Sequence, residues 1–247
     1  MSIAEAQAPI EHNQTVEMLR VKDLQAYYGE SHILHGVNFD VKRGELVTLL
    51  GRNGAGRSTT LKSIMNMVGR RTGSIVINGN ETLQMKAHHI PRLGIGYCPE
   101  ERGIFASLDV QENLLLPPTV SSGGMSLDEI YAMFPNLYER RPSQGTRLSG
   151  GEQQMLAMAR ILRTGARMLL LDEITEGLAP VIVQKLADVL VQLKELGMTI
   201  VLVEQNFRFA APLADRHFVM DHGQIVEEIS AAQLPLRREH LNSMLGV

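Results

Sequence analysis

The stretch LVTLLGRNGAGRSTT, residues 46–60, decides how the rest of the chain is interpreted. Its first five residues form an apolar run that is typical of a buried β-strand. Gly51, Gly54 and Gly56 then let the backbone turn its N–H groups toward an anion. A helix is expected next, ending near Gly69, because apolar residues recur at positions 61, 64, 65 and 68. A strand, a glycine loop and a helix in this order predict a phosphate-binding loop.

The cation of this loop is unusual, because Arg57 stands where such loops carry lysine. A planar guanidinium keeps the charge, but it is wider than an ammonium group and favours two parallel acceptors. We therefore expect ATP to bind through the backbone donors, with its γ-phosphate positioned less well. The Ser58 hydroxyl is the group expected to hold Mg²⁺. The loop residues expected to contact ATP are Gly51, Asn53, Gly54, Ala55, Gly56, Arg57, Ser58 and Thr59.

A second signal is RMLLLDE, residues 167–173, an apolar strand that ends in two acids. Asp172 is expected to hold Mg²⁺, and Glu173 to orient or deprotonate an attacking water. The motif alone is weak, because many strands end in aspartate. Downstream of a phosphate loop it indicates phosphoryl transfer, which needs both an anion-binding loop and a metal-holding acid.

A third signal is LSGGEQQ, residues 148–154, in which Ser149 and two glycines precede a helix. This arrangement predicts a second helix N-terminus that binds an anion. A single nucleotide does not need two such sites on one chain. The simplest use for the second is to cap a nucleotide held by another subunit.

In this order the three motifs resemble those of the ATP-binding-cassette (ABC) ATPases, and the resemblance covers about residues 16–229. It implies a head-to-tail dimer in which each ATP lies between one subunit's phosphate loop and the other's signature motif. The signature residues would be Ser149, Gly150, Gly151 and Glu152. The resemblance also implies that Tyr28 stacks on adenine; the alternative is an ordinary half-buried strand tyrosine.

At two positions the sequence differs from many ABC ATPases, and these differences indicate a subfamily. PEERGIF, residues 99–105, has Glu100 where many cassettes have glutamine, and LVEQN, residues 202–206, has Gln205 where many have histidine. With EGLAP, residues 176–180, these segments resemble the LivF-type ATPases of branched-chain amino acid importers. Gln205 can donate to a γ-phosphate oxygen, and Glu100 can accept bonds at the catalytic centre. The alternative for Glu100 is a solvated loop acid.

The remaining pattern predicts an α/β fold of the P-loop NTPase (ABC ATPase) type. We expect a mostly parallel core sheet, a small antiparallel β subdomain and an inserted helical subdomain. The helical insert should occupy about residues 84–148, where short helical segments are broken by Pro and Gly. The core and β subdomain would take about 16–83 and 149–247, so that residues 16–247 form one domain after a flexible tail, residues 1–15.

The composition limits which partners and which cellular compartment are expected. No apolar run approaches the roughly 18 residues that span a bilayer, and a net charge of −3 without Trp argues against nucleic acid as a partner. The lone Cys98 fits a reducing compartment. Together with the resemblance, this predicts a cytoplasmic protein on the inner face of the cell membrane. Its expected partners are permease subunits, a second ABC ATPase and, indirectly, a periplasmic solute-binding protein.

The sequence therefore predicts an ATP- and Mg²⁺-dependent ATP hydrolase that powers import of branched-chain or related amino acids. The second ATPase is expected to be a different chain, with a homodimer as the alternative. An importer of urea or amides, or an exporter, fits the same motifs. A further alternative is an ATP-binding regulatory subunit that hydrolyses little because of Arg57. A chromosome or repair ATPase would need a long coiled coil between the motifs, and the chain has no such heptads.

Overall fold

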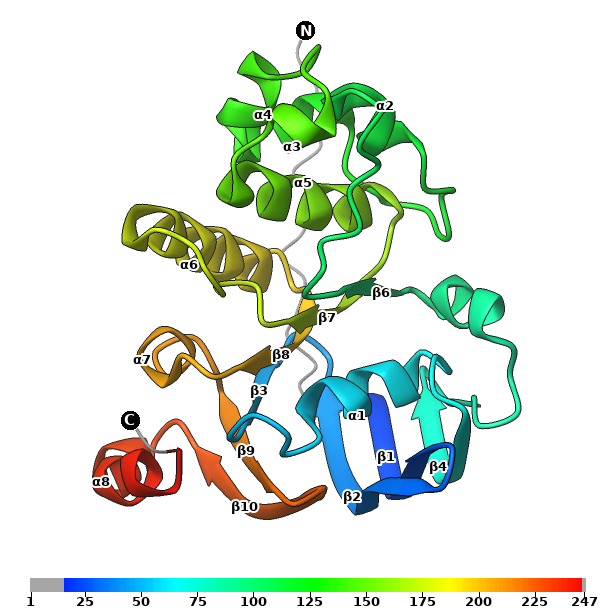
Figure 1. Cartoon of the computed structure of the whole chain (residues 1–247), viewed down its shortest axis with the longest axis vertical. Helices are drawn as coiled ribbons and strands as arrows, with labels where there is room; N and C mark the ends of the chain where they lie inside the picture. Colours follow the sequence, from blue (N-terminus) through cyan, green and yellow to red (C-terminus); the bar gives the residue numbers. More distant parts are fainter. Residues whose placement is uncertain (1–15, 246–247) are drawn as a thin grey trace, which may run out of the picture.

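A six-stranded, mostly parallel sheet forms the centre of the structure, a computed structural model that describes residues 16–245 (Figure 1). Its order is β10 (Gln224–Ser230), β9 (Arg216–Asp221), β3 (Leu46–Leu50), β8 (Thr199–Glu204), β7 (Met168–Asp172) and β6 (Ile95–Cys98). Only the β9–β10 pair is antiparallel among these described strands. Every residue of β3, β7 and β8 is buried, as expected for parallel strands covered on both faces. The predicted parallel core sheet is confirmed. The expected N-terminal tail, residues 1–15, lies outside the described residues.

A second, four-stranded antiparallel sheet lies beside the first. Its order is β2 (Ser31–Lys42), β1 (Glu17–Tyr28), β4 (Arg70–Ile77) and β5 (Asn80–Glu81). The turn between β4 and β5 has positive φ at both Asn78 (48°) and Gly79 (76°), the geometry that suits a tight hairpin. The predicted antiparallel sheet is confirmed.

The helices fall into two groups in Figure 1, with α2–α5 gathered at one end of the molecule. The α-helices are α1 (Arg57–Ile64), α2 (Val110–Leu115), α3 (Leu127–Met133), α4 (Pro135–Glu139), α5 (Gly150–Arg163), α6 (Pro180–Glu195), α7 (Phe207–Ala210) and α8 (Leu234–Leu245). Two 3₁₀ turns are η1 (Ala87–Leu93) and η2 (Gly145–Arg147). None of the helices described between residues 16 and 245 is long and apolar enough to cross a bilayer.

The expected helical insert, about residues 84–148, contains α2, α3 and α4, but it also contains β6, which belongs to the central sheet. We retain a helical subdomain, formed by the part of this segment after β6, as a proposal. The prediction for the end of α1 was wrong. The helix ends at Ile64, before Gly69, because Asn66 adopts a left-handed φ of 55°.

Two hydrophobic cores lie on opposite faces of the central sheet. Alternate side chains of β3 point to each, with Leu46 and Leu50 in one core and Val47 and Leu49 in the other. The first core joins the sheet to α5 and α6, and the second joins it to α1 and the antiparallel sheet. The strand that leads into the glycine loop is therefore fixed from both sides.

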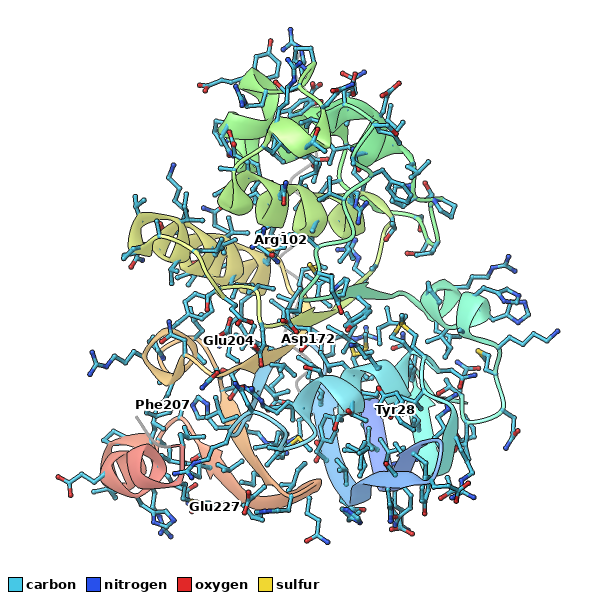
Figure 2. All side chains as sticks on the ribbon, viewed as in Figure 1. Tyr28, Arg102, Asp172, Glu204, Phe207 and Glu227 are labelled. Atoms are coloured by element: carbon cyan, nitrogen blue, oxygen red, sulfur yellow. The ribbon has the colours of Figure 1, made fainter. Side chains whose placement is uncertain are left out.

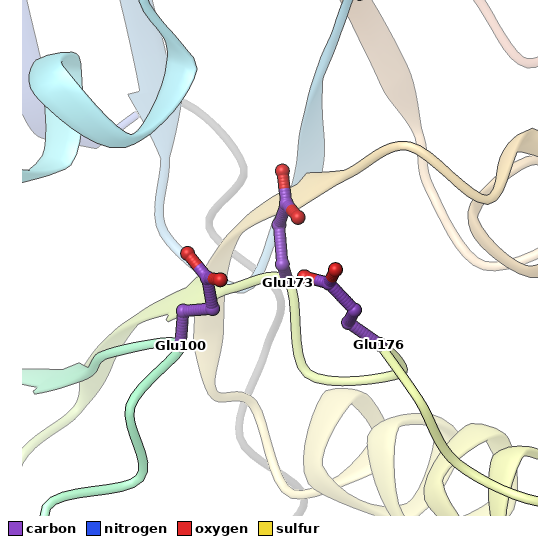
Figure 3. A group of neighbouring side chains, drawn as sticks. All are labelled: Glu100, Glu173 and Glu176. Atoms are coloured by element: carbon purple, nitrogen blue, oxygen red, sulfur yellow. The ribbon is translucent and has the colours of Figure 1, made fainter. Parts of the chain in front are cut away.

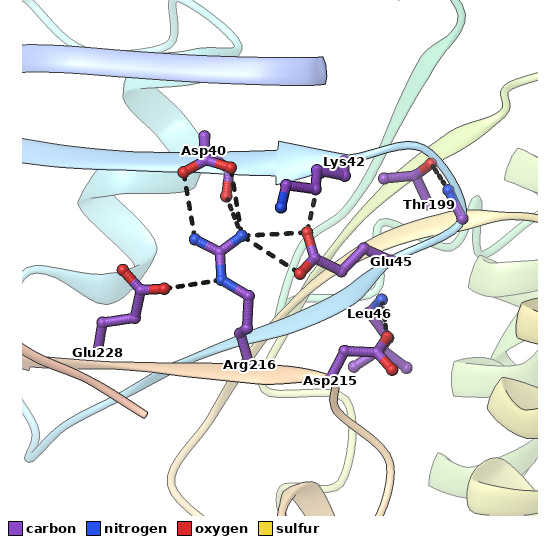
Figure 4. Close-up of polar contacts among 9 residues, drawn as sticks. Asp40, Lys42, Glu45, Leu46, Thr199, Asp215, Arg216 and Glu228 are labelled. Atoms are coloured by element: carbon purple, nitrogen blue, oxygen red, sulfur yellow. Dashed lines mark hydrogen bonds and ion pairs between the residues drawn. The ribbon is translucent and has the colours of Figure 1, made fainter. Parts of the chain in front are cut away.

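Arg216 links the two sheets through ion pairs (Figure 4). From β9 its guanidinium lies 3.2 Å from Asp40 on β2, 3.2 Å from Glu45, the residue before β3, and 2.8 Å from Glu228 on β10. The arginine side chain is only 15% exposed. The pair with Asp40 ties the antiparallel sheet to the central one, and the pairs with Glu45 and Glu228 fix the guanidinium within the central sheet.

Candidate functional site

The ends of four adjacent parallel strands bring the glycine loop and the expected catalytic residues to one edge of the central sheet. In register, Leu50 of β3 lies beside Glu204 of β8, Val203 beside Asp172 of β7, and Leu171 beside Cys98 of β6. The residues that follow these ends are Gly51, Gln205, Glu173 and, two positions on, Glu100. Ligands of parallel α/β sheets bind outside this carboxyl edge, so the topology itself assembles the site.

The glycine loop connects β3 to α1 in a conformation that needs glycine. Gly56 is the N-cap of α1 with φ 102°, and it caps the helix without a side-chain hydrogen bond. A Cβ on Gly51 would lie 2.5 Å from the Met220 carbonyl oxygen. The first-turn N–H groups of α1 therefore face the loop, where they can bind an anion.

Arg57 is buried at the start of α1, with its side chain 4% exposed. Its Nη2 donates to Glu173 Oε1 at 2.6 Å and to Asn53 Oδ1 at 3.3 Å. Its Nη1 is buried and has no hydrogen-bond partner among the described residues. A buried donor without an acceptor costs about 1–3 kcal/mol, so the loop fits a ligand that brings anionic oxygens, such as a nucleotide phosphate.

Ser58 and Asp172 lie in direct contact. The Ser58 hydroxyl donates to Asp172 Oδ1 at 2.8 Å, from the first turn of α1 to the end of β7. Burial raises the pKa of the Asp172 carboxyl, and the hydrogen bond from Ser58 opposes this shift. A hydroxyl beside a carboxylate offers the hard oxygen donors that Mg²⁺ prefers, so this pair fits the expected metal.

Tyr97 belongs to the same group, although no sequence motif pointed to it. Its hydroxyl donates to Asp172 Oδ2 at 3.0 Å from β6, so both carboxylate oxygens of Asp172 are held. Burial, followed by the nearby Asp172 charge, raises the pKa of Tyr97 and keeps it a donor. The available signal was its place in the strand that ends two residues before Glu100.

Three glutamates lie close together at this edge of the sheet (Figure 3), and one of them, Glu173, is paired with Arg57. Carboxylate oxygens of Glu100, Glu173 and Glu176 all lie within 4.8 Å of one another. Burial raises the pKa of Glu173 and Arg57 opposes this, while the Glu176 and Glu100 charges raise it further. The pKa of Glu100 is also raised, first by burial and then by Glu176 and Asp172. A raised pKa makes Glu173 a better proton acceptor near neutral pH.

Gln205 and Tyr28 are both accessible. Gln205 follows the buried end of β8 and is exposed. Tyr28, at the end of β1, is 43% exposed (Figure 2), so its ring can stack on a planar ligand. Neither side chain is hydrogen-bonded to Arg57 or Asp172 in the part of the chain that the structure describes.

The residues around Ser149 form a separate feature. Ser149 caps α5 in a capping box: its hydroxyl accepts from Glu152 N at 3.3 Å, and its N–H donates to Glu152 Oε2 at 2.7 Å. Arg102 donates to Gln153 Oε1 at 3.3 Å, one turn into this helix. Figure 1 shows α5 and α1 on opposite sides of β6 and β7. The side chain of Ser149 is hydrogen-bonded to Glu152, and no hydrogen bond joins Ser149 to the glycine loop among the described residues.

Comparison with known proteins agrees with this geometry. The ABC transporter family model matches residues 34–176. The high-affinity branched-chain amino acid transport ATP-binding protein BraG of Pseudomonas aeruginosa is 39% identical, over 93% of this chain and 100% of its own length. The probable branched-chain amino acid transport ATP-binding protein LivF of Archaeoglobus fulgidus is 37% identical, over 88% of this chain and 94% of its own. The dimeric structure of MJ0796, a bacterial ABC transporter cassette, superposes with a TM-score of 0.77 at 26% identity, over 87% and 99% of the two chains.

Proposed function

The chain belongs to the ABC transporter family of ATP-hydrolysing subunits, and from this premise we propose that it powers an importer of branched-chain or related amino acids. We infer the class of solute from one observation. The chain is 39% identical to a branched-chain amino acid transport ATP-binding protein over the whole length of that protein. The ATPase activity is supported by the loop, Ser58, Asp172 and Glu173 meeting at one strand edge. The comparisons favour neither the urea or amide alternative nor the exporter.

In this proposal the loop N–H groups and α1 bind the phosphates, and Tyr28 stacks on adenine. Ser58 and Asp172 would hold Mg²⁺, which when bound neutralises charge on the phosphate oxygens. Glu173 accepts a proton from the attacking water. Gln205 donates its amide to the γ-phosphate, and Glu100 orients neighbouring groups by accepting hydrogen bonds.

The Arg57–Glu173 pair adds a step to this scheme. Glu173 accepts a water proton only after its carboxylate is released from the Arg57 guanidinium, and phosphate oxygens offer that guanidinium alternative acceptors. Release costs the energy of a mostly buried ion pair. We therefore propose that ATP binds this chain's own loop and is hydrolysed there slowly.

A second ATPase subunit completes the site in this proposal. Because no hydrogen bond joins Ser149 to the chain's own loop among the described residues, we assign Ser149, Gly150, Gly151 and Glu152 to a nucleotide on the partner's loop. If the partner is a different ATPase with a lysine in its loop, the site capped by Ser149 carries most of the turnover. A homodimer would have Arg57 at both sites.

The permease subunits would bind a groove of about 1030 Å³ beside β6. Phe105 and Leu116, which line it, are 50% and 49% exposed, and Pro117, Pro118 and Val120 extend the apolar wall. Exposed apolar surface of this kind marks contacts with partner proteins. The protein would therefore lie on the inner face of the membrane, with a periplasmic solute-binding protein acting through the permeases.

The test is to assemble the chain with its permeases and a second ATPase, in vesicles with the matching solute-binding protein. ATP-dependent uptake of leucine, isoleucine and valine is expected, and Ser149→Ala should abolish most of it. Uptake of urea or amides without branched-chain uptake would assign the alternative importer. ATP-driven release of solute in place of uptake would assign an exporter.

A further inference from the structure

Glu204 is a buried carboxylate that the proposed mechanism does not use. It is the last residue of β8, between Val203, which is in register with Asp172, and Gln205 (Figure 2). The residue is 2% exposed. Burying a carboxylate is expensive unless its oxygens are well hydrogen-bonded. Its partners therefore indicate what it does.

The carboxylate of Glu204 accepts hydrogen bonds from two loops. Thr175, in the loop after β7, donates its N–H to Oε1 at 3.1 Å and its hydroxyl to Oε2 at 3.0 Å. Asn206, in the loop after β8, donates its N–H to Oε2 at 3.4 Å. One side chain thus joins the loop that carries Glu173 to the loop that carries Gln205.

The loop after β7 turns sharply around Thr175. Glu173 has a left-handed φ of 46°, which is strained for a non-glycine residue, and its N–H donates to Val203 O at 2.9 Å. Leu178 N then donates to Thr175 O at 3.2 Å. Thr175 is itself 6% exposed, so its position limits how far Glu173 and Glu176 can move.

The ionisation of Glu204 affects the strength of this link. Burial raises its pKa to about 7, and the negative charge of Glu173 adds to the shift, while its three donors oppose it. The charged group that affects the pKa of Glu204 is Glu173, from the loop after β7. Glu173 is itself paired with Arg57 of α1. Hydrogen bonds to an ionised acceptor are about twice as strong as neutral ones.

We propose that Glu204 is a positioning residue, which holds the Glu173 loop and the Gln205 loop in a fixed relation so that both side chains meet the γ-phosphate. This inference rests on the proposed ATPase function. The ionised carboxylate holds Thr175 more strongly than the neutral acid. Turnover should therefore rise as Glu204 loses its proton around neutral pH.

The test uses the full chain in an Arg57→Lys background, which frees Glu173 to act. Glu204→Ala should lower kcat by on the order of ten- to a hundredfold, with a nearly unchanged KM for ATP. Glu204→Gln keeps one acceptor and should restore part of kcat, but it should remove the rise of kcat around pH 7. Glu195→Gln, an exposed glutamate at the end of α6, is the matched control.

A second measurement does not depend on ATP hydrolysis. Amide hydrogen exchange of Thr175 in the nucleotide-free protein should speed up at least about tenfold in Glu204→Ala, because the N–H loses its acceptor. Thr175→Val should lower kcat less in the Glu204→Ala protein than in the Arg57→Lys parent, since the two side chains act as a unit.

Unchanged kcat and Thr175 exchange in Glu204→Ala would overturn the proposal. So would a lowered Tm with unchanged kcat, because that result assigns Glu204 to stability alone. A parent that binds no ATP and hydrolyses none would instead contradict the proposed function. The exchange measurement would still decide whether Glu204 holds the loop.

Discussion

Arg57 Nη2 lies 2.6 Å from Glu173 Oε1, so the cation of the phosphate loop is paired with the proposed general base. Both side chains are largely buried, at 4% and 13% exposed, so water screens the pair little. The pair spans α1 and the end of β7, the same two elements that bring Ser58 to Asp172.

Tyr97→Phe should weaken the dependence of nucleotide binding on Mg²⁺. The change removes the hydroxyl 3.0 Å from Asp172 Oδ2 and leaves Asp172 held by Ser58 alone. Loss of a group that orients a metal ligand costs about 10- to 100-fold in metal affinity. Titrating Mg²⁺ against ATP binding checks this, with the half-exposed Tyr138→Phe as control. The same Mg²⁺ midpoint in Tyr97→Phe and the unmodified protein would show that Tyr97 has no such role.

Ser149→Ala and Glu173→Gln should have unequal effects in the assembled transporter. Ser149 caps the nucleotide on the partner's loop, whereas Glu173 acts on the nucleotide held beside Arg57. With a lysine-bearing partner, Ser149→Ala should remove most of the transport and Glu173→Gln only a minor part. Uptake rates of the two single variants measure this. Equal losses would contradict an asymmetric pair of sites.

His217 should make the protein less stable in acid. The residue is fully buried on β9, with Nδ1 2.7 Å from Thr48 Oγ1 and Nε2 without a partner among the described residues. Burial lowers its pKa to about 4 from an ordinary 6.5. The folded chain therefore stays neutral at His217 while the unfolded chain takes up a proton, so stability is lost as pH falls below about 6.5.

Between pH 8 and pH 5 this difference amounts to about 2 kcal/mol in the free energy of unfolding. Urea unfolding at several pH values measures it, with His217→Gln as the comparison. The variant should lose about that much less stability on acidification. Parallel pH curves for the two proteins would show that His217 does not contribute.

Much of the fold could be predicted because its signals are local. The apolar run of β3 and the glycine spacing that follows it each lie within a few residues, and the structure has the strand, the loop and the helix in the expected order. The end of α1 was not predictable, since the apolar spacing continues past Ile64 while the backbone turns at Asn66. The left-handed backbone conformation of Asn66 thus ends the helix, although the apolar residues keep their helical spacing.

Less of the site could be predicted, because its contacts join distant parts of the chain. Tyr97 and Glu176 enter it only through the pairing of β6 with β7 and the turn after Glu173. The Arg57–Glu173 ion pair could not be predicted from the sequence either, since the two residues belong to different motifs. The motifs indicated the residues of the site, but only the strand order shows which side chains touch.

Whether Arg57 restrains Glu173 is tested most directly by comparing ATP hydrolysis by the unmodified chain and by Arg57→Lys, at saturating ATP and Mg²⁺. A lysine in the loop would no longer hold Glu173 through a guanidinium, so turnover should rise, by up to about a hundredfold, with ATP affinity nearly unchanged. Adding Glu173→Gln to Arg57→Lys should abolish the gain. Equal turnover of the unmodified chain and the Arg57→Lys variant would contradict the claim that Arg57 restrains the general base.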